Sequence, residues 1–329
     1  MRPSVLTRKG SPDGACGRPA RSLAVVWLLP VLWTAVAAAA PAGADTVTAA
    51  RPVSSHGFLW EARKADRHAL LMGTLHVGLA EDYPPADPAT RQRLSAVDVI
   101  ALEADVTQAD RNAAALLMRA QLAPAEPGLD TRIDAQLKAD TQRVLAQFGI
   151  PAASAWRMKP WMLADTLVVL QASSLGFSPA HSTEAYLASL AAAGGKPIAE
   201  LEGIQAQLEL LDAPAWNEQI DALRQTVRSI LDGEAEHELR TLVAAWRASD
   251  AAAMLEYLNT VRNSPDPAER RQFERLITAR NAAMADKIDR LLQDRRFYLV
   301  AVGSLHFFGS DGLVQELKAR GYTVTPLVP

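Results

Sequence analysis

Apolar runs near the two ends of the chain have the length and spacing of β-strands. Residues 57–64 alternate apolar and polar side chains, and residues 68–74 form the apolar partner of a hairpin that turns at Asp66 and Arg67. Later runs are short and continuously aliphatic, as in buried strands. The pattern predicts strands over residues 57–64, 68–74, 97–103, 196–202, 297–302 and 322–327.

The middle of the chain repeats apolar residues at the spacing of amphipathic helices. Breaks are predicted at residues 212–214 (DAP), 232–233 (DG) and 264–267 (SPDP). The absence of a linker rich in Gly, Ser or Pro indicates one α/β domain over residues 57–329, with a mixed central sheet and a large helical insertion. The predicted helices cover residues 90–96, 107–122, 132–148, 161–174, 183–193, most of 205–292, and 311–320.

The two ends of this predicted domain resemble each other. Residues 70–102 read strand, Gly-Thr-Leu-His, loop, helix and strand, and residues 297–327 read strand, Gly-Ser-Leu-His, loop, helix and strand. We interpret the likeness as a short internal duplication. The central sheet is then built from N-terminal and C-terminal strand-GxxH-helix-strand units that lie side by side.

The first 44 residues have the features of a secretory signal peptide. Arg18 and Arg21 precede an apolar run over residues 23–40, and residues 42–44 (AGA) fit a cleavage site with small side chains. We therefore expect a signal peptide over residues 1–44, a flexible linker over residues 45–56, and a periplasmic or secreted protein. The alternative is an uncleaved anchor helix, which is the one membrane association that the pattern suggests.

Composition and charge narrow the function classes. The chain has 329 residues, of which 49% are hydrophobic, and its 34 basic and 37 acidic residues give a net charge of −3. An ordered globular protein with this balance is not expected to bind nucleic acid. The sole cysteine, Cys16, lies in the predicted leader, so the mature chain has no disulfide and no thiol nucleophile. Walker, HExxH, GxSxG and GxGxxG motifs are also missing from the sequence.

The candidate chemistry lies where predicted strands end. His76 and His306 close the two GxxH motifs, while Glu103 and Glu202 each end an apolar strand. In open α/β sheets ligands collect beyond the carboxyl ends of the strands. Two imidazoles with one or two carboxylates form a ligand set for Zn²⁺, Mn²⁺, Co²⁺ or Fe²⁺, and a bound metal supports hydrolysis without a protein nucleophile. The alternative interpretation is that both histidines cap strand ends or donate to backbone carbonyls.

Two further features have both a structural and a functional interpretation. Glu184 opens a predicted helix after the N-cap candidates Ser182 and Thr183, and a helix start at the sheet edge also presents its carboxylate to a ligand. Arg280 and Asn281 lie within an amphipathic helix. An arginine there either pairs on a solvated face, or holds an oxyanion or orients a carboxylate.

Taken together, the motifs resemble the TraB/GumN family, which is related to the Tiki metalloproteases within the erythromycin-esterase/ChaN-like group. The matching stretches span nearly the whole predicted mature chain, from FLWEARKADRHALLMGTLHVG through VDVIALEAD, MKPWMLADTL, STEAYLASLAAAGGKPIAELEG and ERLITARNAAMADKIDRLL to FYLVAVGSLHFFGSDGLVQELKARGYTVTPL.

The resemblance implies a divalent-metal site held by His76, Glu103 and His306, with Glu202 of the ELEG stretch as a further ligand or general base. It also implies Mn²⁺ or Co²⁺, with Zn²⁺ as another option, and peptide-bond hydrolysis of the Tiki kind. The family helix that usually begins Gly-Val-Asp begins Ser-Thr-Glu here, which makes Glu184 a fourth candidate metal ligand with a side chain longer by one methylene. The family's Arg-Asn pair matches Arg280 and Asn281.

We therefore hypothesise a metal-dependent peptidase or amidase of the cell envelope, acting on a peptide or another small or polymeric envelope substrate. Glu202, Arg280 and Asn281 are its candidate catalytic residues. The alternative is a non-catalytic envelope protein that binds a peptide, glycan or partner in the same crevice. The sequence does not identify the substrate, the native metal or the oligomeric state.

Overall fold

The computed structural model describes residues 57–85, 87–105, 107, 114–115, 119 and 127–327. The predicted leader, the predicted linker over residues 45–56 and nearly all of the predicted helix over residues 107–122 lie outside the described residues. Within the described ranges, no helix combines the length and the apolar character that crossing a membrane requires.

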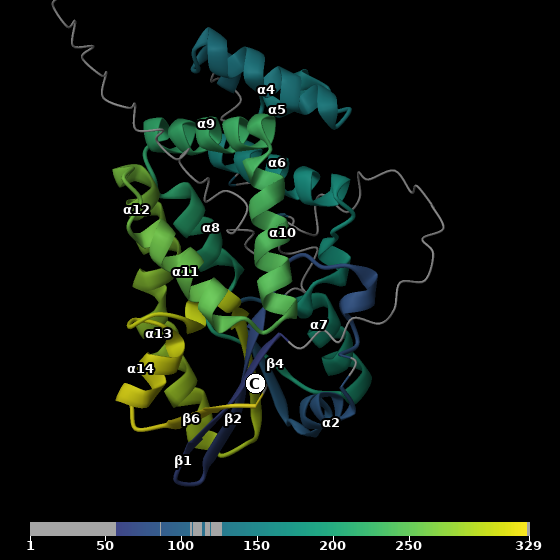
Figure 1. The fold of residues 1–329 in the computed structure, drawn as a ribbon, viewed down its shortest axis with the longest axis vertical. Helices are drawn as coiled ribbons and strands as arrows, with labels where there is room; N and C mark the ends of the chain where they lie inside the picture. Colours follow the sequence, from purple (N-terminus) through teal and green to yellow (C-terminus); the bar gives the residue numbers. More distant parts are fainter. Residues whose placement is uncertain are drawn as a thin grey trace, which may run out of the picture.

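A six-stranded mixed sheet forms the lower half of the molecule in Figure 1, in the order β4-β3-β5-β2-β1-β6. Strands β4, β3, β5 and β2 run parallel, and β1 is antiparallel to both of its neighbours. All six predicted strands are present, with ends that differ from prediction by one or two residues. The strands are β1 (Phe58–Lys64), β2 (Arg67–Thr74), β3 (Val99–Leu102), β4 (Ile198–Glu200), β5 (Tyr298–Gly303) and β6 (Thr323–Pro326).

The helices follow the predicted amphipathic segments, and all three predicted breaks are present. A further break, between Arg247 and Ala251, was not predicted. Gly233 separates two long helices with a positive φ of 83°, a conformation that glycine adopts without a steric cost. The helices are α2 (Pro88–Ala96), α4 (Ala135–Gln147), α5 (Ala152–Ala155), α6 (Pro160–Ser174), α7 (Thr183–Gly194), α8 (Ile204–Asp212), α9 (Trp216–Asp232), α10 (Glu234–Arg247), α11 (Ala251–Arg262), α12 (Pro267–Phe273), α13 (Ala279–Leu291) and α14 (Leu313–Ala319).

The sheet is covered on both faces, which explains its apolar strands. Leu94 of α2 and Leu187 of α7 pack with Ile100 on one face, whereas Ile288 of α13 and Leu317 of α14 belong to the core of the other face. In Figure 1 these two helix pairs lie on opposite sides of the strands. The fold is therefore an α/β layer arrangement, as predicted.

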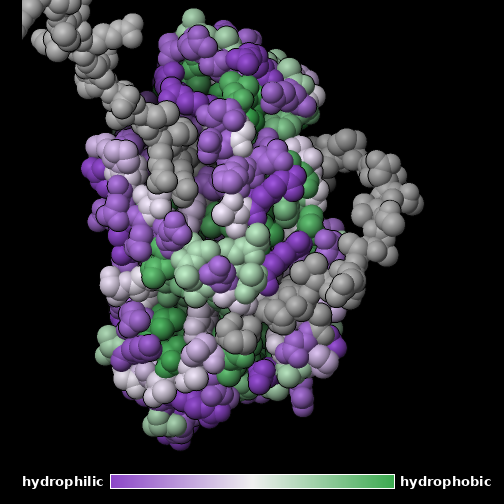
Figure 2. Space-filling model, in the orientation of Figure 1, coloured by the Kyte–Doolittle hydropathy of each residue, from purple (hydrophilic) through white to green (hydrophobic). Residues whose placement is uncertain are grey.

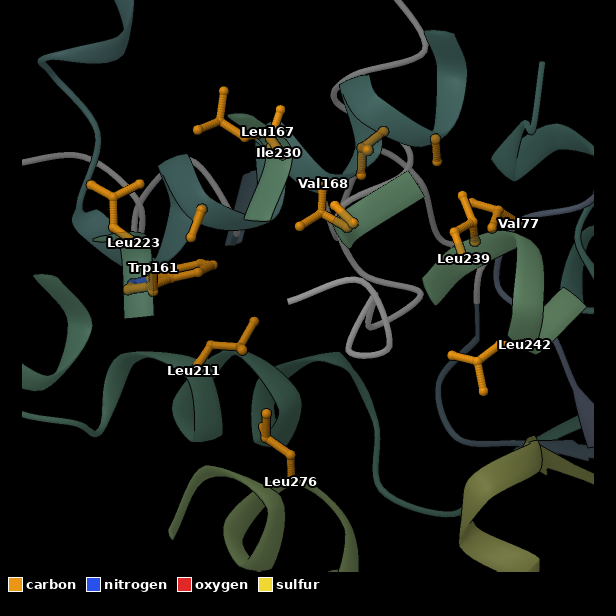
Figure 3. Close-up of a cluster of buried hydrophobic side chains, with 14 of the residues drawn as sticks. Val77, Trp161, Leu167, Val168, Leu211, Leu223, Ile230, Leu239, Leu242 and Leu276 are labelled. Carbon is orange, nitrogen blue, oxygen red and sulfur yellow. The ribbon is translucent and has the colours of Figure 1, made fainter. Parts of the chain in front are cut away.

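The helical insertion packs over the carboxyl ends of the parallel strands and has its own core (Figure 1). Figure 3 shows Trp161 and Leu167 of α6 among α9 side chains, and Val77, which follows the first GxxH motif, near Leu239 and Leu242 of α10. The outer surface is largely hydrophilic, as Figure 2 shows over α9 and α10. Because it packs over the strand ends, the insertion covers the edge of the sheet from which the GxxH motifs emerge.

The two GxxH units lie in one sheet. Their first strands, β2 and β5, are parallel neighbours with Thr74 opposite Gly303. Their second strands diverge, because β3 pairs with β5 while β6 pairs with β1 at the far edge. The predicted side-by-side arrangement therefore holds for the GxxH turns, which start level with each other.

Candidate active site

Four polar side chains emerge at one edge of the sheet because the strands that carry them are parallel. Strands β4, β3, β5 and β2 lead in that order to Glu202, Glu103, His306 and His76. The Ser304 hydroxyl donates to the carbonyl of Thr74 at 2.9 Å and ties the two GxxH turns together. Residues that are far apart in the sequence thus share one small region.

Gly303 marks the point at which three of these side chains meet. A methyl group built on Gly303 would lie 3.4 Å from Oε1 of Glu103, 3.4 Å from Nε2 of His76 and 3.6 Å from Cδ2 of His306. The Gly303 amide donates to Oε1 of Glu103 at 2.8 Å. The glycine therefore leaves a space that both imidazoles and the Glu103 carboxylate border.

Arg280 of α13 connects the two glutamates. Its Nη2 donates to Oε2 of Glu103 and to Oε2 of Glu202, both at 2.5 Å, and its Nε donates to Oε1 of Glu202 at 2.8 Å. Burial alone would raise the pKa of the Glu103 carboxyl, but Arg280, His76 and the Gly303 amide together outweigh burial and hold that pKa below its ordinary value. The two carboxylates in turn raise the pKa of Arg280 against the effect of its own burial. Glu103 and Arg280 therefore form a buried ion pair.

A π-helical turn, η6 (Glu274–Thr278), comes directly before α13. Consecutive residues of an α-helix point about 100° apart, and a π turn is a local widening that is frequent at functional sites. Nη1 of Arg280 donates to the carbonyl of Leu276 in this turn at 2.7 Å. The turn thus supports the guanidinium from behind while Asn281, the next residue, also reaches the site.

His306 is buried and its tautomer follows from its neighbours. The Asn281 side-chain amide donates to the carbonyl of Asp311 at 2.8 Å, so its Oδ1 faces Nδ1 of His306 at 2.6 Å and accepts a hydrogen bond from the Nδ1–H group. Nε2 therefore carries the lone pair, 3.3 Å from Nη1 of Arg280. Burial and the Arg280 charge lower the pKa of His306 well below its ordinary value, so this imidazole is neutral.

His76 has a charged neighbour instead. Its Nδ1 lies 2.8 Å from Oε1 of Glu184, which also accepts the Thr74 hydroxyl at 2.5 Å. Burial lowers the pKa of His76, but Glu184 more than compensates and the pKa lies above its ordinary value. Ser182 caps α7 through the amide of Ala185, and the helix start thereby presents Glu184 to the imidazole.

The donor chemistry of three residues fits a divalent metal. The Nδ1 atoms of His76 and His306 face oxygen atoms of Glu184 and Asn281, the arrangement that fixes metal-ligating imidazoles in proteins. Glu103 adds an ionised carboxylate beside them. In the described part of the chain, however, no three His, Cys, Asp or Glu side chains stand at metal-binding distances from one another.

The other two predicted ligands have different partners. Both oxygens of Glu202 accept hydrogen bonds from Arg280, and the Glu184 carboxylate lies on the Nδ1 side of His76. Glu202 is more exposed than Glu103, with 16% against 4% of its side-chain surface accessible. Glu202 is thus more accessible to a substrate than Glu103 is.

Gln207 is a site residue that sequence reasoning missed. It is buried on α8, and its Nε2 donates to Oε2 of Glu103 at 3.2 Å and to Oε2 of Glu202 at 3.3 Å. The available signal was a polar residue on the apolar face of an amphipathic helix, where it precedes Leu208. That position demands a buried partner, but the sequence does not say which one.

Comparison with known proteins points to one family. The sequence model of the TraB/PrgY/gumN family matches residues 58–326. The chain is 26% identical over 259 residues to proteins named uncharacterized protein YbaP in Shigella flexneri and in Escherichia coli strain K12, covering 77% of this chain and 89% of each relative. It is 23% identical over 345 residues to a zebrafish (Danio rerio) protein named metalloprotease TIKI1, covering 92% of this chain and 69% of that one. No solved structure matches the chain.

Proposed function

We propose that this chain, which belongs to the TraB/PrgY/gumN family, is an exported metal-dependent hydrolase that cleaves a peptide or another amide bond. The observation that carries the proposal is the convergence of His76, Glu103 and His306 around Gly303 at the carboxyl edge of the sheet. The name of the TIKI1 relative, a metalloprotease, supports the same reaction class. The apolar run and small-residue motif before residue 45 support export.

His76, Glu103 and His306 would hold the metal. A bound Mn²⁺, Co²⁺ or Zn²⁺ supplies a Lewis acid for the amide carbonyl and lowers the pKa of a water molecule. Glu184 and Asn281 face the two Nδ1 atoms, so Nε2 of each imidazole would be the metal-binding atom. Nε2 of His306 would then exchange its contact with Nη1 of Arg280 for the metal. The neutral state of His306 suits this role, because a protonated imidazole does not bind metal.

Glu202 and Arg280 are the candidates for the general base and for stabilising the negative charge on the amide oxygen. Glu202 would be the general base that accepts a proton from water, because it is more exposed than Glu103 and its orientation is fixed by Arg280. Nη1 of Arg280 lies close to His306 Nε2, so the guanidinium stands where an amide oxygen that gains negative charge would be stabilised.

One observation favours the alternative of a non-catalytic binding protein. Arg280 already pairs with both Glu103 and Glu202, and Gln207 also donates to both carboxylates. A cluster that is closed by its own ion pairs is able to hold a peptide or glycan nearby without any metal. The two functions differ in their requirement for a divalent ion.

Metal analysis of the purified exported protein tests the proposal. After dialysis against Mn²⁺, wild-type protein is expected to retain about one equivalent, and His76→Ala and His306→Ala to retain almost none. His68→Ala is the matched control, because His68 also contacts a carboxylate, Glu61 at 2.9 Å, but lies away from the GxxH turns. Circular dichroism verifies that each variant is folded.

Activity is measured next with a peptide library and added Mn²⁺ or Co²⁺. Glu202→Gln is expected to retain the metal and to lose about 10²–10⁴-fold in kcat, the range for loss of a general base. If wild-type protein retains no metal, or if all three histidine variants retain it equally, the hydrolase proposal fails and the binding-protein alternative takes its place.

A further inference from the structure

A hollow of ≈ 240 Å³ lies between the loop that follows β2 and the start of α7. We propose that this hollow is a subsite for an uncharged aromatic or large aliphatic side chain of a peptide substrate, next to the bond that is cleaved. The inference rests on the proposed function and assigns its substrate class. The argument depends on where the hollow lies, what lines it and how its walls are held.

Both walls of the hollow continue directly from residues of the candidate active site. Leu79 lines one wall three residues after His76, and Ser182 lines the other two residues before Glu184. The hydroxyl of Thr183 joins the walls, because it accepts from the amide of Leu75 at 3.0 Å and lies 2.5 Å from the hydroxyl of Tyr83. The hollow is therefore tied through Thr183 to the turn that carries His76.

The lining selects against charge. Tyr83 and Tyr186 stack with ring centroids 5.0 Å apart at 19°, and Leu79, Pro84 and Ala185 add apolar surface. The lining contains no Lys, Arg, Asp or Glu, and its titratable side chains are the two tyrosines and His181. A charged side chain would lose hydration here without gaining a charged partner, whereas a ring gains a stacking surface.

The size of the hollow suits a large side chain. An apolar cavity of about 150 Å³ binds benzene, so ≈ 240 Å³ accommodates a phenyl or indole group, or a leucine side chain, with room for the open mouth. Small side chains would leave most of the apolar lining in contact with water and gain little from burial.

The walls are held in place before any substrate arrives. The buried Asp82 accepts from the amide of Leu79 at 2.8 Å and pairs with Arg247 of α10 at 2.6 Å. The backbones of Gly78 and Ser178 exchange two hydrogen bonds, at 3.1 and 2.8 Å. A preformed subsite avoids part of the ordering cost of binding, so a single side chain contributes measurably to affinity.

The experiment narrows the hollow with Ala185→Leu and uses Ala188→Leu as the matched control. Both alanines are half-buried on α7, and only Ala185 lines the hollow. Binding of N-acetyl-L-phenylalaninamide and N-acetyl-L-lysinamide to metal-free protein is measured by ligand-observed NMR. We expect wild type and Ala188→Leu to prefer the phenylalanine probe at least tenfold, and Ala185→Leu to bind it at least tenfold more weakly.

Ser189→Asp gives a second test that does not fill the hollow. Ser189 is an exposed helical position at its rim, so the substitution is compatible with folding, and it is expected to shift preference towards the lysine probe. Equal binding of both probes to wild type, or equal affinity of the Ala185→Leu and Ala188→Leu variants, would overturn the subsite.

The outcome separates this inference from the proposed function. Metal retention and peptide cleavage with no effect of Ala185→Leu on the preferred side chain would leave the hydrolase standing and overturn the subsite. Probe selectivity that disappears in Ala185→Leu, in a protein without metal or cleavage, would support the hollow as a peptide-binding site and overturn the hydrolase.

Discussion

The two GxxH turns have nearly the same sequence and opposite electrostatics. His76 lies beside the Glu184 carboxylate, which raises its pKa despite burial, whereas His306 lies beside the neutral amide of Asn281 and near Arg280, and its pKa is well below the ordinary value. The two residues also differ in exposure. The side chain of His76 has 14% of its surface accessible, whereas His306 as a whole residue has 3% accessible. Identical motifs thus deliver two different imidazoles to one site.

The difference shows that the GxxH motif determines where each imidazole lies, whereas the residues around it determine its pKa. In each turn the glycine lies at the end of a parallel strand and the imidazole returns to the sheet edge. The partner that meets each imidazole comes from another part of the chain, α7 for His76 and α13 for His306. The same motif therefore meets an anionic partner in one turn and a neutral partner in the other.

The largest expected effect comes from removing Arg280, which pairs with both glutamates of the site and lies close to His306. Arg280→Ala leaves the buried Glu103 and the half-buried Glu202 near each other without their cation, and breaking a buried pair in this way costs about 3–5 kcal/mol of unfolding free energy. Urea unfolding measures this loss.

Arg240→Ala is the control for that loss. It removes an exposed pair with Glu236 on α10 and is expected to cost less than about 1 kcal/mol. Equal costs for the two arginine variants would contradict the central role given to Arg280.

Alanine at the glycine of each motif is expected to have a smaller effect on unfolding free energy, and a larger one at Gly73 than at Gly303. A methyl group on Gly73 would meet Cβ of Phe58 at 3.2 Å and Cα of Ser304 at 3.3 Å, so Gly73→Ala is expected to cost about 1–3 kcal/mol through overpacking. The methyl of Gly303→Ala would have ordinary contacts, and we expect a change within about 1 kcal/mol.

Metal titration then sharpens the contrast between these glycines. The Gly303→Ala methyl occupies the space between His76, Glu103 and His306, and Mn²⁺ affinity is expected to fall at least tenfold while the fold is retained. Wild-type affinity in this variant would mean that the ion does not bind among the three side chains.

The smallest expected effect is on the pH dependence of the unfolding free energy. Metal-free wild-type protein is compared with the His76→Gln and His306→Gln variants. The folded pKa of His76 is raised, so its contribution to stability is fully present below the unfolded pKa of about 6.5 and is lost as the pH rises through the folded value. The folded pKa of His306 is lowered, so its contribution falls as the pH drops below about 6.5.

The difference in unfolding free energy between wild type and variant should therefore change with pH in opposite directions for the two variants. Each slope is at most about 1.4 kcal/mol per pH unit. Urea unfolding between pH 5 and 8, in the presence of a chelator, provides the measurement. Glu184→Gln should make the His76 slope smaller or reverse its sign, because burial then acts on His76 without the main carboxylate that opposes it, and should leave the His306 slope unchanged. Slopes of the same sign would contradict the electrostatic difference.

Much of the fold was predictable because its signals are local. The aliphatic run over residues 297–302 and the Ser-Pro-Asp-Pro break at residues 264–267 carry their structure in adjacent residues, and both predictions are confirmed. The order of the strands was not predictable, since pairing of β3 with β5 joins segments about 200 residues apart. No local pattern encodes which strand lies beside which.

The chemical groups of the site could be listed from the sequence: two histidines after strand-ending glycines, acidic residues at other strand ends, and an Arg-Asn pair on a late helix. The contacts among these groups arise from tertiary packing. Arg280 bridges Glu103 and Glu202, Asn281 fixes His306, Glu184 meets His76, and Gln207 joins the carboxylates. Spacing along a chain reports secondary structure, whereas burial and ion pairing depend on which surfaces meet after the helical insertion folds over the sheet.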